Sequence, residues 1–193
     1  MRQLFFFSNN KNKIIEIKKI FNKFNLEILS LNELGISEEP EENGKSFEEN
    51  AKIKSDYGFN KTGIPCFADD SGICIETLNW RPGVYSKRYL ENFKSNETCF
   101  KSIIRSVKKT NKKNAYFKTS ISLTIDNNQN ILFNGKIDGI ISNQIKGGFG
   151  FGYDPIFIPK NYKNTLAELS TKEKNQISHR SIAVTKLINF LSN

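Results

Sequence analysis

The sequence predicts an α/β fold in which helices flank a mixed β-sheet that can divide into two lobes. Helical and strand patterns alternate in the first half of the chain, which is typical of an α/β fold. Two long strand patterns follow each other directly in the second half, which favours an antiparallel hairpin. The chain has 193 residues, 37% of them hydrophobic and 16 of them Phe, so it can bury a sizeable core.

Five strands are expected, over residues 3–7, 26–34, 64–68, 114–126 and 129–142. The third strand is expected to end at Asp69 and Asp70, just before a glycine turn. In the fourth, Ile121, Leu123 and Ile125 alternate with polar residues, and the turn signal DNNQN leads into the fifth. No internal repeat or clear break divides the sequence, so residues 1–193 are predicted to form a single domain.

Four helices are expected, over residues 8–24, 47–59, 96–109 and 178–193. In the first, Ile14, Ile17 and Phe21 recur at helical spacing. Ser46 precedes the second, and Glu49 follows three residues later, which is the pattern of a capping box. Ser178 is expected to cap the last helix in the same position.

Composition argues against several classes of protein. No apolar run approaches the roughly 18 residues of a membrane span, and the run LFFF is too short for a signal peptide, so a cytoplasmic protein is expected. Cys66, Cys74 and Cys99 include no C-x-x-C pair, which argues against a disulfide framework or a zinc site. We expect these cysteines to be buried apolar side chains.

The net charge of +9 could attract a polyanion. The lysines are scattered along the chain, and the abundance of Lys, Asn, Ile and Phe fits a bias toward AT-rich codons. We therefore expect no stable nucleic-acid partner.

The segment SNNKNK, Ser8–Lys13, joins the first expected strand to the first helix. Backbone N–H groups and the helix dipole make such a junction suitable for phosphate, and Lys13 adds a positive charge. The alternative is an ordinary capped helix start, because the glycines of a Walker loop are absent.

The segment GGFGFGYDP, residues 147–155, interleaves glycines with aromatic residues. Such a loop lets the backbone approach a ligand while Phe149, Phe151 or Tyr153 offers a flat face. The alternative is a glycine-rich turn whose aromatic side chains belong to the core.

His179 and Arg180 fall in the first turn of the last helix, where the helix dipole disfavours positive charge. An anionic partner would explain them, and Lys174 lies just before them in the sequence. A solvated helix start is the alternative.

Two adjacent carboxylates, Asp69 and Asp70, repel each other and need compensation. With Glu41 and Glu42 they would make an acidic cluster, and the cationic residues named above would lie opposite. Carboxylates that bind Mg²⁺, or Mn²⁺, opposite a cationic cradle are what a nucleoside triphosphate requires.

The sequence resembles the inosine triphosphate pyrophosphatase family. The matching segments are SNNKNKIIE, EENGKSFEENAKIKS, FADDSGICIETLNWRPGVYSKRY, GGFGFGYDPIFIP and TLAELSTKEKNQISHRSIA, which span Ser8 to Ala183. Asn9 departs from the glycine usual in the family, and Asn tolerates left-handed backbone geometry, so the loop is expected to persist.

This resemblance implies an elongated fold with a cleft between two lobes, usually a homodimer, that converts ITP, dITP or XTP to the monophosphate and pyrophosphate. Asp70 would be the catalytic carboxylate, acting as a general base or holding a metal-bound water. Glu41 would be the second carboxylate that binds the metal. Asp69 would be either a further ligand or a supporting residue. The implied substrate-binding residues are Ser8, Asn9, Asn10, Lys11, Asn12 and Lys13 for phosphate, Phe151, Gly152, Tyr153 and Asp154 for the base, and Ser71, Lys174, His179 and Arg180.

Two other classes of function stay open. Another phosphoryl hydrolase would release orthophosphate instead of pyrophosphate. A nucleic-acid-binding module would bind in a salt-sensitive way without turnover. A serine hydrolase using His179 would lack the usual G-x-S-x-G elbow.

Overall fold

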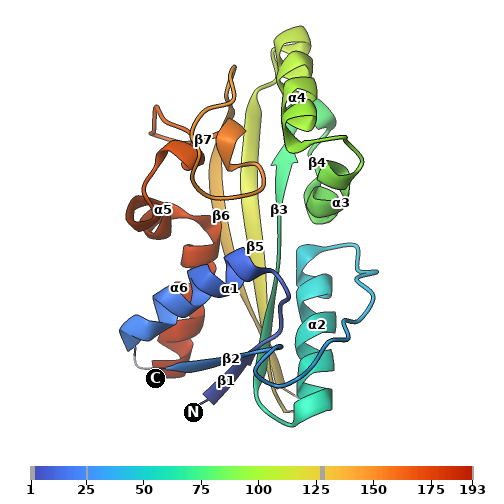
Figure 1. Cartoon of the computed structure of the whole chain (residues 1–193), viewed down its shortest axis with the longest axis vertical. Helices are drawn as coiled ribbons and strands as arrows, with labels where there is room; N and C mark the ends of the chain where they lie inside the picture. The colour runs from blue at the N-terminus through green and yellow to red at the C-terminus, as the bar shows by residue number, and fades with distance from the viewer. Residues whose placement is uncertain (1–2, 25, 127–128, 193) are drawn as a thin grey trace. The chain divides into compact units, whose positions relative to one another are not determined.

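The structure is a computed structural model that describes residues 3–24, 26–126 and 129–192. These residues form a mixed β-sheet with strand order β2–β1–β3–β5–β6–β7, and β4 pairs with β3 (Figure 1). The strands are β1 (Gln3–Phe6), β2 (Glu27–Ser30), β3 (Cys66–Ile75), β4 (Arg81–Pro82), β5 (Asn114–Asp126), β6 (Gln129–Ile141) and β7 (Phe157–Pro159). The predicted mixed α/β architecture is confirmed; part of the DNNQN turn lies outside the described residues.

The helices are α1 (Lys11–Phe21), α2 (Phe47–Thr62), α3 (Ser86–Glu91), α4 (Asn96–Thr110), α5 (Thr171–Ile177) and α6 (His179–Ser192). The four expected helices are present. The short α3 and α5 were not expected, because six or seven residues are too few to show a helical period.

Strand β3 differs from its prediction. It does not end at the aspartates but continues through Gly72 to Ile75, where it pairs antiparallel with β4. Asp69 and Asp70 are therefore interior strand residues, exposed by only 1% and 6%. A strand can carry buried carboxylates without ending in solvent when other side chains satisfy them.

The chain divides into two compact units. The first unit contains residues 1–70, 119–135 and 180–193, and the second contains residues 71–118 and 136–179. The prediction of one functional domain over residues 1–193 stays a prediction.

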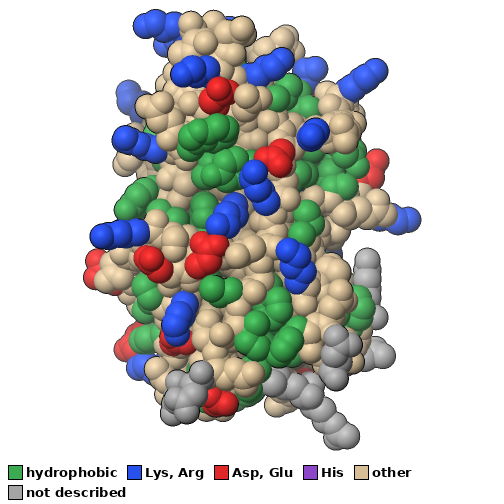
Figure 2. Space-filling view, turned by 180° about the vertical axis from the view of Figure 1, so that it is seen from behind, with side chains coloured by type: hydrophobic (Ala, Val, Ile, Leu, Met, Phe, Trp, Pro, Cys, Tyr) green, Lys and Arg blue, Asp and Glu red, His purple; other side chains and the backbone are tan. Residues whose placement is uncertain are grey.

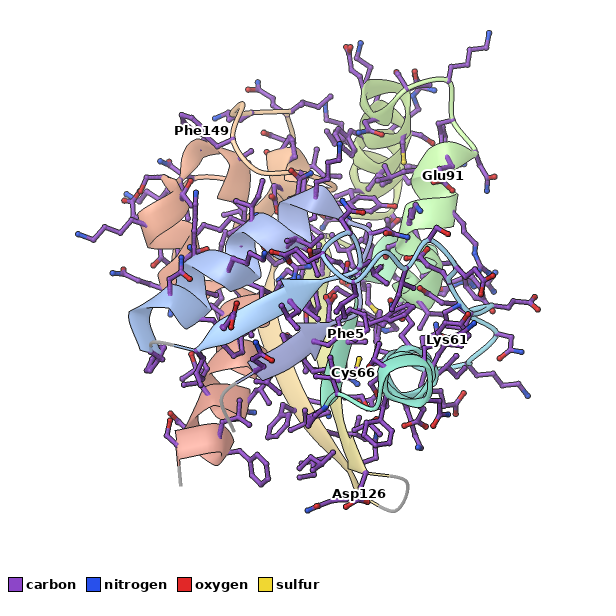
Figure 3. All side chains as sticks on the ribbon, turned by 60° about the horizontal axis from the view of Figure 1, so that its bottom comes forward. Phe5, Lys61, Cys66, Glu91, Asp126 and Phe149 are labelled. Atoms are coloured by element: carbon purple, nitrogen blue, oxygen red, sulfur yellow. The ribbon has the colours of Figure 1, made fainter. Side chains whose placement is uncertain are left out.

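In the first unit, helices α1 and α6 cover one face of the strands and α2 covers the other (Figure 1). Leu4, Phe6 and Phe67 pack with α1 and α6. Phe5 and Cys66 belong to the core cluster on the α2 side, and Figure 3 labels both. The strand period of two therefore gives each face its own core.

Helix α2 lies close to the strands because Gly58 has no side chain. A Cβ atom at Gly58 would lie 2.4 Å from Cys66 Sγ and 2.8 Å from the ring of Phe7. This close approach brings the polar residues of α2 within reach of β3.

The second unit has its own core, built around α4 with strands β5 and β7. Phe117 and Phe157 meet edge to face at 4.8 Å between ring centroids. The three cysteines are free and buried, as predicted. No helix of the described residues is both long and apolar enough to cross a membrane.

Candidate active site

The two aspartates of β3 serve opposite faces of the first unit, because successive side chains on a strand alternate. Asp69 follows Phe67 by two residues and contacts residues of α1 and α6. Asp70 follows Ala68 by two residues and contacts α2. The adjacent carboxylates therefore have different hydrogen-bond partners.

Asp69 is compensated by two cations of the protein. Lys13 Nζ donates to its Oδ1 at 3.0 Å, and Arg180 Nε donates to its Oδ2 at 3.4 Å. Arg180 Nη1 also donates to Glu16 Oε2 at 2.5 Å. The four charges alternate in sign, so the cluster is close to neutral.

The pKa values in this cluster follow from burial and pairing. Burial lowers the pKa of Lys13, although Asp69 opposes that effect. Burial also disfavours the Arg180 cation, but Asp69 and Glu16 outweigh it and raise its pKa. The sequence suggested Mg²⁺ as the compensation for both aspartates and an external anion for Arg180. For Asp69 and Arg180, this protein's own side chains supply these partners.

Asp70 lies in a different environment. Asn50 Nδ2 donates to its Oδ2 at 3.2 Å. Burial raises the pKa of Asp70, although the nearby charges of Lys54 and Lys13 oppose the shift. A carboxylate with a raised pKa is a better proton acceptor near neutral pH.

Lys54 links the acidic loop to β3. Its Nζ donates to the backbone oxygen of Asp69 at 2.7 Å and lies 3.0 Å from Glu42 Oε1. Burial disfavours the Lys54 cation, but the charges of Asp70 and Glu42 outweigh it and raise its pKa.

A stripe of four residues on α2 holds the acidic loop, residues 38–44. The stripe residues are Asn50, Lys54, Tyr57 and Lys61. Asn50 contacts the Gly44 backbone, and Lys54 contacts Glu42. Tyr57 and Lys61 both contact Glu38. Their spacing of four, three and four residues places them on one face of the helix.

Within the part of the chain that the structure describes, the stripe contacts the side chain of Glu42, through Lys54, and not that of Glu41. Glu41 is exposed, and its backbone oxygen accepts a bond from Asn43 N at 3.1 Å. The assignment of Glu41 as a metal ligand stays a prediction, and the geometry favours its neighbour Glu42. Among the described residues, no three His, Cys, Asp or Glu side chains form a metal-holding group.

The segment Ser8–Lys13 is a capped helix start. Asn10 Oδ1 accepts bonds from the backbone of Asn12 and Lys13, and Ser8 Oγ accepts one from Asn10 N. The ordinary N-cap reading therefore describes Asn10 correctly, and phosphate binding by this segment stays a prediction. Lys11 and Asn9 are exposed, and Asn9 is not among the described residues with positive φ.

The second unit holds a charged pair beside an aromatic ring. Lys174 Nζ donates to Asp154 Oδ2 at 2.7 Å, and Phe151 N donates to the same oxygen at 2.9 Å. Lys174 Nζ also lies 4.8 Å from the centroid of the Phe151 ring. Gly150 is required here, because a Cβ atom on it would lie 2.1 Å from Asp154 Oδ2.

Other residues expected to bind substrate in the second unit have varied roles. Tyr153 is a core residue whose hydroxyl donates to the Ser86 backbone at 2.9 Å, so a ligand contact would have to use its backbone. His179 is buried and stacks on Phe117 at 4.7 Å. Ser71 and Gly152 are half-buried, and their substrate roles stay predictions.

Sequence reasoning missed Asn50, Lys54 and Glu16. A signal was present for the first two: they lie four residues apart on the face of α2 that also carries Ala51 and Gly58. Polar residues on the buried stripe of a helix indicate a specific partner. Glu16 gave no such signal, because one exposed-looking acid on a helix is ordinary.

The two aspartates should respond oppositely to neutralisation when no metal is present. Asp69→Asn leaves the half-buried Lys13 and the buried Arg180 beside a neutral amide, and breaking a buried pair costs about 3–5 kcal/mol. The pKa of Asp70 is raised in the folded state, so its contribution favours folding at low pH and turns unfavourable as pH rises through that pKa. The Asp70→Asn variant should therefore reach its unfolding midpoint at a higher urea concentration than the parent, at pH 7 in EDTA. Equal losses in both variants would contradict the separation of roles.

Comparisons with known proteins identify the family of this chain. The model of the Ham1 family matches residues 4–190. A dITP/XTP pyrophosphatase of Flavobacterium psychrophilum is 46% identical over 193 residues, covering 99% of this chain and 100% of that protein. A dITP/XTP pyrophosphatase of Christiangramia forsetii is 43% identical over 190 residues, covering 98% and 99%. The structure of a HAM1 protein from Coxiella burnetii has a TM-score of 0.89 at 32% identity, covering 100% and 99%. The resemblance noted in the sequence is thereby confirmed, and this chain belongs to the Ham1 family.

Proposed function

We propose that this chain hydrolyses non-standard purine nucleoside triphosphates such as ITP, dITP and XTP to the monophosphate and pyrophosphate, removing them from the nucleotide pool. The observation that carries the proposal is Asp70, a buried carboxylate with a raised pKa beside a lysine and an acidic loop. The names of the relatives, dITP/XTP pyrophosphatases, supply the substrate class.

Asp70 is the proposed general base. It would accept a proton from the water that attacks the α-phosphorus. Lys54 and Lys13 are the proposed phosphate contacts nearby, since both carry charge toward Asp70. Arg180 is a weaker candidate for direct contact, because it is paired with two carboxylates, Asp69 and Glu16, whereas Lys13 and Lys54 each form one described salt bridge.

The residues present fit Mg²⁺ or Mn²⁺. Their donors are carboxylate oxygens, which hard divalent cations prefer, and Mg²⁺ often uses one or two carboxylates plus substrate phosphates. Asp70 and Glu42, or Glu41 as the resemblance implies, would hold the ion. Bound there, it would screen phosphate charge and acidify a water molecule.

The pair Lys174–Asp154 and the ring of Phe151 are the proposed base-binding residues. A planar base can stack on Phe151, while fixed donors near a 6-oxo group would reject a 6-amino base. The buried pair holds its charges in fixed positions, which such discrimination needs.

Charge gives little support to the nucleic-acid alternative. Figure 2 shows Lys and Arg side chains spread over the visible face, with acidic side chains between them. We also propose that the chain forms a homodimer and that it is located in the cytoplasm. Sedimentation of the purified chain would test whether it is a dimer.

The central test is a panel of ITP, XTP, dITP, GTP and ATP with Mg²⁺, scored for pyrophosphate. We expect pyrophosphate from the first three, and Asp70→Asn should lose about 10²–10⁴ in rate because general-base help is removed. Orthophosphate as the product would favour the rival hydrolase, and near-normal turnover by Asp70→Asn would refute its role.

The metal carboxylate can be assigned with two adjacent variants. Glu42→Gln should raise the Mg²⁺ concentration for half-maximal activity by about 10-fold or more, since a ligand charge is lost. Glu41→Gln, exposed and next in sequence, is the matched control and should stay near the parent. The reverse result would restore the assignment drawn from the resemblance.

Contacts to the purine base and contacts to the phosphates can be separated with tripolyphosphate, an inhibitor that has no purine base. Phe151→Ala should weaken ITP binding by about 1–3 kcal/mol through lost stacking, yet keep its affinity for tripolyphosphate. Lys13→Ala should weaken the binding of both ITP and tripolyphosphate. Phe149→Ala is the control from the same loop, since Phe149 is 65% exposed and should change neither affinity (Figure 3). Melting temperatures identify any variant that fails by unfolding.

A further inference from the structure

We propose that Asn50 positions the Asp70 carboxylate and couples it to the acidic loop, a role that rests on the proposed function of Asp70. Asn50 lies on α2 and is 2% exposed. A buried side-chain amide has to satisfy both its oxygen and its nitrogen, and here the two ends serve different segments.

The direction of the amide follows from its neighbours. Gly44 N lies 2.8 Å from Asn50 Oδ1, and a backbone N–H can only donate, so the atom facing it is the oxygen. The nitrogen therefore faces Asp70 Oδ2, at 3.2 Å. One defined oxygen of Asp70 receives a donor, which fixes the rotation of the carboxylate and thus the direction of its other oxygen.

The loop side of the link depends on a glycine. A Cβ atom on Gly44 would lie 2.5 Å from Asn50 Oδ1 and 2.8 Å from Glu49 Cβ. Two residues before Gly44, Glu42 is held by Lys54. The same amide therefore ties the loop that carries Glu42 to the strand that carries Asp70.

A simpler role would be to satisfy the buried N–H of Gly44 alone. The two roles use opposite ends of the amide, so they can be separated. Asn50→Asp keeps an acceptor for Gly44 and replaces the donor toward Asp70 with a like charge. Combined with Asp70→Asn, it exchanges the amide and the carboxylate and rebuilds the bond in the opposite direction.

The first measurement is steady-state kinetics with ITP at saturating Mg²⁺. Asn50→Asp should lower kcat by about 10–100-fold, the usual effect of losing a supporting partner, while KM changes by less than about threefold. Asn60→Asp adds the same charge to an exposed position of α2 and should leave kcat unchanged. Retention of kcat by Asn50→Asp would overturn the positioning role.

The second measurement is thermal unfolding in EDTA, which needs neither metal nor turnover. Asn50→Asp should lower the melting temperature, and the exchanged pair Asn50→Asp/Asp70→Asn should regain most of that loss, by more than the gain that Asp70→Asn gives alone, while staying inactive. Failure of the exchanged pair to regain stability would overturn the contact. If the parent releases no pyrophosphate from ITP, the proposed function fails, whereas the unfolding result still decides whether Asn50 bonds Asp70.

Discussion

The first unit depends on the burial of the Asp69 carboxylate between two cations. Lys13 comes from α1 and Arg180 from the start of α6, so one carboxylate joins segments separated by more than a hundred positions of sequence. Moving isolated charges out of water is expensive, and the alternation of signs from Lys13 through Asp69 and Arg180 to Glu16 offsets that penalty. The cluster thereby fixes both helices against the same strand.

Because side chains alternate along a strand, Asp70, the residue after Asp69, faces the opposite side of β3, where the proposed chemistry lies. Because Asp70 faces the other side of β3, it contacts α2 through Asn50, and burial raises its pKa above that of an exposed aspartate. A single strand thus carries a charge-paired acid, Asp69, and the proposed general base, Asp70, in consecutive positions. Each is suited to its task by the helices that cover its face.

Periodicity in the sequence was sufficient to predict the longer elements. The strand of residues 114–126 matches β5 at both ends, since thirteen residues show a clear alternation. The end of β3 was wrong because two adjacent acids look like a solvent-facing boundary, and only their partners, far away in the sequence, make them acceptable inside a sheet. Local pattern contains no information about such partners.

The site shows the same limit. The sequence could not assign partners: it gave Arg180 to an external anion, and the resemblance gave the metal to Glu41, whereas the loop carboxylate held by α2 through Lys54 is Glu42. Choosing between neighbours in a loop requires knowing which one a distant helix contacts, here through Lys54. That information lies in the register of α2 against the loop, which depends on tertiary packing.

The stripe on α2 has a consequence for insertions and deletions. Its four residues share a face only while the helix keeps its count, since each residue turns the helix by about 100°. One residue removed between Lys54 and Tyr57 would rotate the contacts to Glu38 away from those to Gly44 and Glu42. The loop could then be held at one end but not at both. This part of the protein should therefore tolerate exchanges of exposed residues far better than any change of length.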